Sequence, residues 1–245
     1  MIEKKKILAI TLARGGSKRV PKKNITLINN KPLLQYTIDE VKKSKYIDNY
    51  IVSTDDNDVI NVCKNLNVNY HNRPKEFAQD TSTSASAIKN VIELHKDYDI
   101  IVEIMCTNPL KTVDDIDGCI EKLIKSDSDS VVSVVRVWDN HPSRVKFIEN
   151  DMLNDFYPEI PESRRQDLTP PAYVRNGSIY AFWKSSFLKY NNRLGKTCRP
   201  FIMPEERTIN IDEPIDLELA KILIKNKETN DDYCSRLDGG CNNDW

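Results

Sequence analysis

Short apolar runs and amphipathic stretches alternate along the first half of the chain. Apolar runs typical of buried strands lie at 7–13, 50–54, 68–71, 100–106 and 131–137. Between these runs, apolar residues recur at every third or fourth position in 32–43, 59–66, 87–95 and 116–124, which predicts helices. Alternating strands and helices predict an α/β fold with a doubly wound, mostly parallel sheet. Ligands of such sheets bind beyond the carboxyl ends of the strands.

The regular alternation stops near Trp138. Residues 138–176 are rich in Pro, Asn, Asp and Arg, and the segment is too long for a plain connection, so an extended arm or lid is expected. Strand patterns return at 178–183 and 201–203, and a last helical pattern covers 215–224. The sequence therefore predicts one domain over 1–226 that carries this arm, followed by a polar, disordered tail at 227–245.

Charge and cysteine content narrow the class of protein. The chain has 245 residues, with 36 Lys and Arg against 37 Asp and Glu, so its net charge gives no reason to expect a nucleic-acid partner. No run is long enough to span a bilayer, and the short apolar run after the basic start is interpreted as a strand, not a signal peptide. Cys63, Cys106 and Cys119 lie in core patterns, which favours reduced thiols in a cytoplasmic protein. Only Cys234 and Cys241, in the tail, are candidates for pairing.

A basic loop with two adjacent glycines follows the first strand. It reads Leu-Ala-Arg-Gly-Gly-Ser-Lys-Arg-Val-Pro-Lys-Lys-Asn over 12–24, in a chain that has 7 glycines in all. Glycine allows a backbone to approach a ligand closely, and the surrounding cations suit a polyphosphate. The loop is neither a Walker A sequence nor Gly-x-Gly-x-x-Gly, which disfavours a kinase or a dehydrogenase. A solvated basic turn is the structural alternative.

Five further motifs follow this loop in a fixed order. They are Ile-Val-Ser-Thr-Asp at 51–55, Arg-Pro-x-x-Phe-Ala-x-Asp-Thr-Ser at 73–82, Thr-Asn-Pro-Leu-Lys-Thr at 107–112, Asn-Gly-Ser-Ile-Tyr at 176–180 and Ile-Asn-Ile-Asp-Glu-Pro-Ile-Asp-Leu at 209–217. With the loop, they resemble the signature of the acylneuraminate cytidylyltransferase (CMP-sialic acid synthetase) family, over about residues 7–224.

The resemblance implies a fold, a reaction and partners. The fold would be a Rossmann-like nucleotidyltransferase fold with an extended dimerisation arm at 138–176, and the protein a homodimer. The reaction would join CMP from CTP to a sialic-acid-type nonulosonic acid, with release of pyrophosphate and with Mg²⁺ as cofactor. Neither a nucleic acid nor a membrane is an expected partner.

The resemblance also implies nucleotide-binding and catalytic residues. Arg14, Lys18 and Lys23 match phosphate-contacting positions, and Arg14, Lys23 and Asp212 are the catalytic candidates. Contacts to the nucleotide are expected from Leu12, Ala13, Arg14, Gly15, Ser17, Lys18, Lys23, Asn24, Arg73 and Ser84. Three of these have structural alternatives: Asn24 as a turn cap, Arg73 as a surface residue and Ser84 as a helix N-cap.

Asp212 matches the magnesium ligand of the family. A second Asp is usual two positions earlier, where this chain has Asn210. Strand alternation places both side chains on one face, so a site with one carboxylate and one amide oxygen is expected. The structural alternative is that Asp212 caps the helix that follows it.

Positions that match the sugar side of the family are Arg165, Gln166, Tyr173, Asn176 and Tyr180. Arginine pairs well with a carboxylate, and the family's equivalent of Arg165 can reach a sugar in the partner subunit. Met105 replaces the glutamine that usually contacts the sugar, so legionaminic or pseudaminic acid is an alternative to N-acetylneuraminate. His141 is a candidate general base, although ordering of a loop is the favoured interpretation.

Two other functions are left open by the sequence. One is a related sugar nucleotidyltransferase, such as a Kdo cytidylyltransferase or a guanylyltransferase. The other is a catalytically silent nucleotide-binding homologue, which Asn210 and Met105 would favour.

Overall fold

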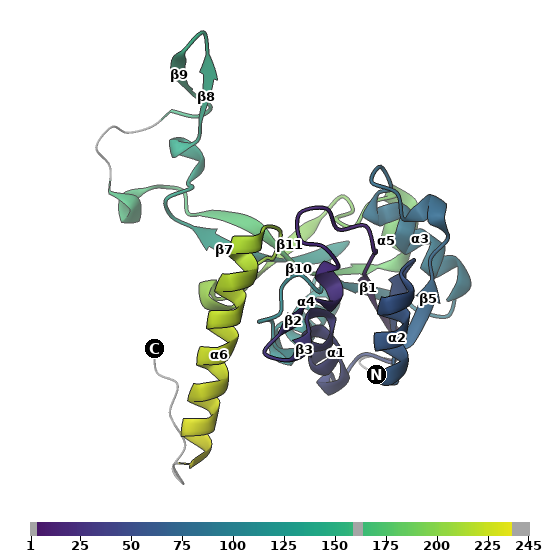
Figure 1. The fold of residues 1–245 in the computed structure, drawn as a ribbon. Coiled ribbons are helices and arrows are strands. Elements are labelled where there is room, and N and C mark those ends of the chain that lie inside the picture. The colour runs from purple at the N-terminus through teal and green to yellow at the C-terminus, as the bar shows by residue number, and fades with distance from the viewer. Residues whose placement is uncertain (1–3, 159–163, 237–245) are drawn as a thin grey trace.

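A seven-stranded sheet forms the centre of the protein, in a computed structural model that describes residues 4–158 and 164–236 (Figure 1). The strand order is β11-β7-β10-β6-β1-β4-β5. Only β10 runs antiparallel to its neighbours within this sheet. The strands are β1 (Ile7–Leu12), β4 (Asn49–Thr54), β5 (Asn69–Asn72), β6 (Ile100–Ile104), β7 (Ser130–Val137), β10 (Ala172–Trp183) and β11 (Cys198–Ile202). The predicted mostly parallel α/β fold is confirmed.

Helices cover both faces of the sheet. One face carries α1 (Leu33–Lys43), α2 (Asn57–Asn65) and α4 (Val113–Ile124), and the other carries α3 (Ser84–Leu94) and α5 (Lys184–Tyr190) (Figure 1). In β1, Ile7 and Ala9 pack beneath α4, whereas Leu8 and Ile10 pack beneath α3. A strand buried on both sides is apolar at nearly every position, which is why β1 lacks the alternation of a half-exposed strand; its one polar residue, Thr11, donates its hydroxyl to Ile104 O.

The last helix, α6 (Pro214–Arg236), lies beside the sheet and packs against a small hairpin of β2 (Leu27–Ile28) and β3 (Lys31–Pro32). The helix continues past the predicted end at 224, so the expected disordered tail is wrong for 227–236, and 237–245 lie outside the described residues. The apolar pattern stops first, but the polar residues that follow include no Gly or Pro before 237 and are compatible with a helix. No helix within 4–158 or 164–236 has the length and apolar character needed to cross a bilayer.

The predicted arm contains a β-hairpin that stands away from the sheet (Figure 1). Its strands are β8 (Lys146–Glu149) and β9 (Met152–Asp155), joined by a two-residue turn. Asn150 and Asp151 in this turn have φ angles of 51° and 63°, a conformation that Asn and Asp tolerate well. Strand β10 already begins at Ala172, so residues 172–176 belong to the sheet and the arm is shorter than predicted.

The cysteines that were expected in the core are there. Cys63, Cys106 and Cys119 are buried and free, and Cys198 on β11 is free and exposed. Nothing is described of the Cys234 side chain, and Cys241 lies outside the described residues.

Candidate active site

A cavity of about 460 Å³ opens beyond the carboxyl end of β1, where an α/β sheet is expected to bind its ligand. Its lining joins the basic loop after β1, the end of β6 and the segment before α6. Predicted nucleotide and metal residues in the lining are Leu12, Arg14, Ser17, Lys18, Lys23, Asn24, Asn210 and Asp212. The lining also includes Arg19, Val20, Cys106, Thr107 and Gly177, which the sequence did not single out as site residues. The signal that could have identified these residues is their position inside the quoted motifs or next to one.

Two predicted catalytic residues from opposite ends of the chain meet in this cavity. Lys23 Nζ lies 3.0 Å from Asp212 Oδ1 and donates to Ile211 O at 2.9 Å. The Lys23 side chain is 16% exposed and that of Asp212 is 54% exposed, so the carboxylate faces the solvent side of the pair. The backbone carbonyl of Ile211, beside Asp212, therefore positions the Lys23 ammonium in the cavity.

Asp212 is not the cap of α6. Asp216 Oδ2 accepts hydrogen bonds from the backbone N–H groups of Asp212 and Glu213 at 2.9 and 2.8 Å, and so caps the helix from within its first turn. The capping alternative for the Asp212 side chain is therefore wrong. Its carboxylate instead accepts from Lys23 and from Asn210 Nδ2, the latter at 2.6 Å.

Asp212 and Asn210 fit a cation that also binds substrate phosphates. In the described part of the chain, no three His, Cys, Asp or Glu side chains gather closely enough to hold a metal by themselves. Magnesium in nucleotide sites uses one or two carboxylates and takes its other ligands from phosphates and water. A single exposed carboxylate with a neighbouring amide meets that requirement and would not form an all-protein cage.

Asn24 stabilises the basic loop through hydrogen bonds of its side chain. Its side chain is 7% exposed, donates from Nδ2 to Arg14 O at 2.8 Å and accepts from Cys106 Sγ at 3.1 Å. Both ends of the amide are thus used inside the protein. Asn24 lines the cavity and holds the backbone at Arg14 in place, which goes beyond the turn cap that was the structural alternative.

Arg73 is buried rather than a surface residue, so that alternative is wrong. Its side chain donates from Nε to Ser53 Oγ at 3.0 Å and from Nη2 to Ser53 O at 2.6 Å, and burial lowers the pKa of the guanidinium. Ser53 O also accepts from Ala13 N at 2.9 Å. Arg73 and Ala13 therefore support the start of the loop, and neither is part of the cavity lining in this structure.

Gly15 and Ser84 have local structural roles that differ from each other. Gly15 N donates to Asp55 Oδ1 at 3.0 Å, and a Cβ at Gly15 would lie 2.8 Å from Asp56 Oδ2, which explains the need for glycine. Ser84 is the first residue of α3, whose cap is Thr83, accepting from Ser86 N at 3.1 Å. The N-cap alternative for Ser84 is therefore wrong, and the structure does not place Ser84 in the cavity lining.

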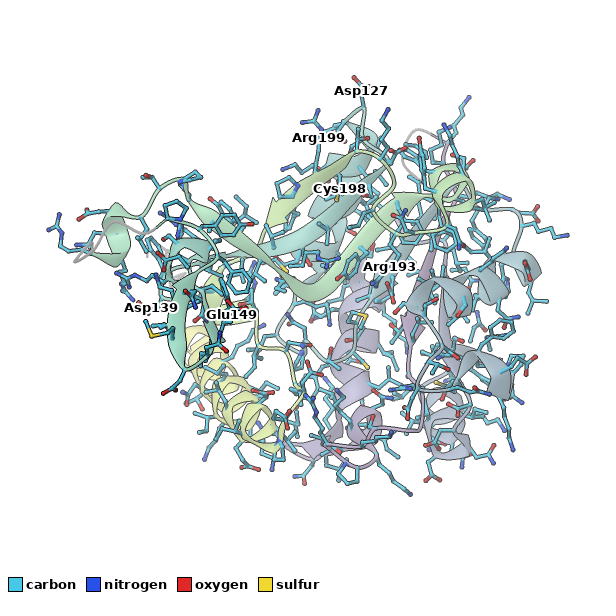
Figure 2. The ribbon with its side chains drawn as sticks, turned by 90° about the horizontal axis from the view of Figure 1, so that it is seen from above. Asp127, Asp139, Glu149, Arg193, Cys198 and Arg199 are labelled. Carbon is cyan, nitrogen blue, oxygen red and sulfur yellow. The ribbon has the colours of Figure 1, made fainter. Side chains whose placement is uncertain are left out.

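The predicted sugar residues are not assembled at the cavity within one chain. Arg165 and Gln166 are exposed on the arm, where Arg165 Nη1 lies 3.6 Å from Asp139 Oδ2, on the side of the molecule labelled by Asp139 in Figure 2. Tyr173 is 45% exposed on the part of β10 nearest the arm. The lining includes Gly177 but none of the five predicted sugar residues.

The side chains of Asn176 and Tyr180 are buried against neighbouring residues of the main domain instead. Asn176 Oδ1 accepts from Ser133 Oγ at 2.6 Å, and its Nδ2 donates to Met203 Sδ at 3.1 Å. Tyr180 is 7% exposed and lies beneath the guanidinium of Arg193, 4.1 Å from the ring centre. Of the 176–180 motif, Gly177 lines this cavity, whereas Asn176 and Tyr180 do not.

His141 orders the base of the arm. It is 5% exposed, with Nε2 2.9 Å from Pro170 O and Nδ1 2.8 Å from Ser143 Oγ. A carbonyl oxygen only accepts, so Nε2 carries the proton and Nδ1 accepts from Ser143. Both ring nitrogens are thus in use, which agrees with the loop-ordering interpretation of this residue.

A fully buried lysine lies behind the cavity. Lys111 Nζ donates to Thr37 Oγ1 at 2.8 Å and to the backbone oxygen of Asn108, and burial lowers its pKa to about 7. Cys106, Glu40 and Asp115 face it and oppose this lowering. Thr107 O accepts from Ile211 N at 2.8 Å, so Lys111 braces the turn at 107–108 that contacts the segment of Asp212. This segment is not a strand, contrary to the expected alternation, although Asn210 and Asp212 still lie side by side.

The Lys111 pKa predicts an unusual dependence of stability on pH. Between its pKa of about 7 in the folded protein and its usual value of 10.5, the unfolded chain binds more protons, so stability rises with pH in this window. Relative to Lys111→Met, wild-type protein should gain about 2 kcal/mol of unfolding free energy from about pH 7 to pH 9, measured by urea denaturation. Lys125→Met, at the exposed residue that follows α4, is the matched control and should show no such trend. A wild-type-to-variant difference that stays constant with pH would contradict the assignment.

Known proteins with similar sequences include cytidylyltransferases. The sequence profile of the family described as "Cytidylyltransferase" matches residues 8–229. A pseudaminic acid cytidylyltransferase of Campylobacter jejuni is 31% identical over 227 residues, covering 90% of this chain and 97% of that protein. An N-acylneuraminate cytidylyltransferase of Escherichia coli O18:K1:H7 is 29% identical over 224 residues, and the match spans 53% of its length.

Solved structures share the fold. A CMP:2-keto-3-deoxy-manno-octonic acid synthetase complexed with CTP superposes with a TM-score of 0.68 and 19% identity, over 91% of this chain and 99% of the other. A 4-diphosphocytidyl-2C-methyl-D-erythritol synthase of Anaerococcus prevotii superposes with a TM-score of 0.66, also at 19% identity, over 90% of this chain and 96% of the other.

Proposed function

The chain belongs to the cytidylyltransferase family, and we propose that it transfers CMP from CTP to a nonulosonic acid and releases pyrophosphate. One observation carries the proposal: cations of a glycine-containing loop and the carboxylate of Asp212 line the same cavity beyond β1, where Lys23 meets Asp212. This arrangement suits a triphosphate with its metal ion, because both the anion and the cation find partners of opposite charge. The names of the relatives supply the nucleotide and the class of sugar.

The proposed reaction needs positioning and charge stabilisation more than covalent chemistry. The anomeric hydroxyl of the sugar attacks the α-phosphorus of CTP and loses its proton to solvent. The bond from that phosphorus to the bridging oxygen breaks, and its electron pair leaves with pyrophosphate. Arg14, Lys18 and Lys23 hold the departing phosphates and stabilise their charge. Asp212, with Asn210 beside it, would hold Mg²⁺, which would supply further positive charge to the phosphates. His141 is not proposed as the base, because both of its ring nitrogens are engaged.

Within the class of nonulosonic acids, Met105 favours a substrate other than N-acetylneuraminate. Its side chain lines the cavity and packs on the apolar cluster of β1 and α3, so it offers a thioether where the family usually has a glutamine amide. An apolar side chain binds a methyl or deoxy position better than a hydroxyl, since a buried hydroxyl would lack a partner. Pseudaminic and legionaminic acids are therefore the proposed substrates ahead of N-acetylneuraminate.

The test is a matrix of nucleotides and sugars with product identification. CTP, GTP and UTP are each incubated with Mg²⁺ and with pseudaminic, legionaminic, N-acetylneuraminic and Kdo sugars. Pyrophosphate release and product mass are recorded for each pair. We expect product from CTP with a nonulosonic acid. Product from Kdo, or from GTP, would identify a related sugar nucleotidyltransferase instead, and CTP binding without any product would identify the silent homologue that Asn210 favours.

We also propose that the protein is a cytoplasmic homodimer whose arms complete the sugar sites. Free, buried cysteines support a reducing compartment. Arg165, Gln166 and Tyr173 are not part of the lining of the cavity in their own chain, and each is exposed. The hairpin of the arm is rich in exposed apolar side chains, including Ile148, Met152 and Leu153. Apolar patches of this kind on a projecting element are typical of a protein interface.

Charged substitutions in the hairpin should separate the subunits. Ile148 and Leu153 are paired across β8 and β9 and are 76% and 70% exposed, so replacing both with Asp should leave the main domain folded. Light scattering should report a dimer for wild-type protein and a monomer for this variant, with a loss of sugar turnover. Leu94→Asp, at a 64% exposed position on α3, is the matched control and should remain dimeric. A monomeric wild-type protein would refute the dimer.

A further inference from the structure

The cations of the basic loop already have carboxylate partners in the protein. Arg19, Lys22 and Lys23 each pair with one acidic residue, at 2.6, 2.7 and 3.0 Å. Asp80 differs from these partners because it binds two loop cations at once. Those two cations, Arg14 and Lys18, both line the cavity.

The Asp80 carboxylate divides its two oxygens between these cations. Oδ1 lies 3.0 Å from Arg14 Nη1, and Oδ2 lies 2.5 Å from Lys18 Nζ. The hydrogen bond from Lys18 is the main cause that lowers the pKa of Asp80, so the carboxyl group is ionised at neutral pH. Arg14 Nη1 also donates to the neighbouring backbone oxygen, Gln79 O, at 3.2 Å. The turn at 79–80 thus presents three oxygens to the basic loop.

The turn that carries Asp80 is held together without the loop. Ser82 Oγ donates to Glu76 O at 2.9 Å and accepts from Gln79 N at 3.2 Å, and Ser82 N donates to Gln79 O at 3.0 Å. The Asp80 side chain takes part in none of these bonds and is 51% exposed. Its carboxylate therefore stands on a preformed turn, and its removal leaves the turn's own hydrogen bonds in place.

We propose that Asp80 is an internal counter-anion that a polyphosphate must displace from Arg14 and Lys18, which weakens the binding of CTP and pyrophosphate. The inference rests on the proposed function, in which these two cations contact the phosphates. A carboxylate and a phosphate compete because each offers paired, charged oxygens to the same donors. Exposed ion pairs are weak, so a ligand with several phosphate charges displaces Asp80. When pyrophosphate leaves, the carboxylate returns to the cations and opposes rebinding.

The test compares two asparagine substitutions that remove the same charge from the surroundings of the loop. Asp80→Asn keeps the shape and the hydrogen-bonding oxygen but removes the charge. Asp58→Asn is the matched control, because Asp58 pairs with Lys22, which is outside the cavity lining. The dissociation constants of inorganic pyrophosphate and of CTP are measured by calorimetry with the full chain, with Mg²⁺ and at one ionic strength. Thermal melting confirms that each variant is folded.

We expect Asp80→Asn to tighten pyrophosphate and CTP binding by about threefold to tenfold, the effect of removing two weak ion pairs. Asp58→Asn should change either dissociation constant by less than about twofold, because it alters only the screened electrostatic potential around the loop. Unchanged or weaker binding in Asp80→Asn, or equal tightening in both variants, overturns the role of Asp80. A wild-type protein that binds neither ligand contradicts the proposed function itself, and that outcome is visible before any variant is compared.

Discussion

Replacing Asp212 with asparagine should lower turnover by about a hundredfold to a thousandfold, because the site would lose its one carboxylate for a metal ion. Asp212 meets Lys23 at 3.0 Å in the cavity, and the amide of Asn210 at 2.6 Å. Asparagine keeps an oxygen for these neighbours but not the charge that attracts Mg²⁺. The side chain is 54% exposed, so the fold should be unaffected.

The measurement is steady-state pyrophosphate release over a range of Mg²⁺ concentrations. We expect the kcat to fall and the Mg²⁺ concentration for half-maximal rate to rise. Glu213→Gln, at the adjacent exposed carboxylate that pairs with Arg19, is the matched control and should keep most of the activity. Near-normal turnover in a folded Asp212→Asn enzyme would show that Asp212 is not the metal ligand.

Arg193→Ala should lower the free energy of unfolding by about 3 kcal/mol near neutral pH, the loss expected when one partner of a buried ion pair is removed. Arg193 lies against the central strands in Figure 2 and pairs with Glu103 of β6, whose side chain is fully buried. The second carboxylate oxygen, Glu103 Oε1, has no hydrogen-bond partner among the described residues. Without Arg193, the buried charge on Glu103 would lose its ion-pair partner, and Arg73 would remain as the cation that acts on it.

The pH dependence distinguishes this cause from a simple loss of packing. Burial raises the pKa of Glu103, while Arg193 and Arg73 lower it, so the pKa of Glu103 should rise further in the variant. Above the unfolded value of about 4.3, the folded variant then binds more protons than the unfolded chain, and its stability falls as pH rises. Its deficit relative to wild-type protein should therefore be smaller at about pH 5 than at about pH 7.5, measured by urea denaturation.

A double-mutant comparison supplies the control. In a Glu103→Gln background the buried charge is absent, so Arg193→Ala should cost clearly less than it does in the wild-type background. A cost that is equal in both backgrounds and independent of pH would show that Arg193 acts only through its contact with the Tyr180 ring.

The placement of strands and helices could be predicted because it depends on near neighbours in the chain. The continuous apolar run of β1 and the helical spacing of α4 each predicted the observed element to within a few residues. The hairpin of β2 and β3 was missed because its strands have two residues each, too few to show a period. The end of α6 was missed because polar residues continue the helix after its apolar face has ended.

For the candidate site, the sequence by itself determined the residue types: a cationic, glycine-containing loop after the first strand and one acidic residue in a late motif. Only the tertiary structure decided which side chains meet. Lys23 faces Asp212, Asn24 braces Arg14, and Asp80 binds Arg14 and Lys18. The tertiary structure also buries the Asn176 side chain against Ser133 and Met203, so it does not reach the cavity as its motif had predicted. The physical reason is the sequence separation of the interactions. Local patterns determine the strands and helices, whereas the direction in which a side chain points depends on strand order and register between residues far apart in the chain.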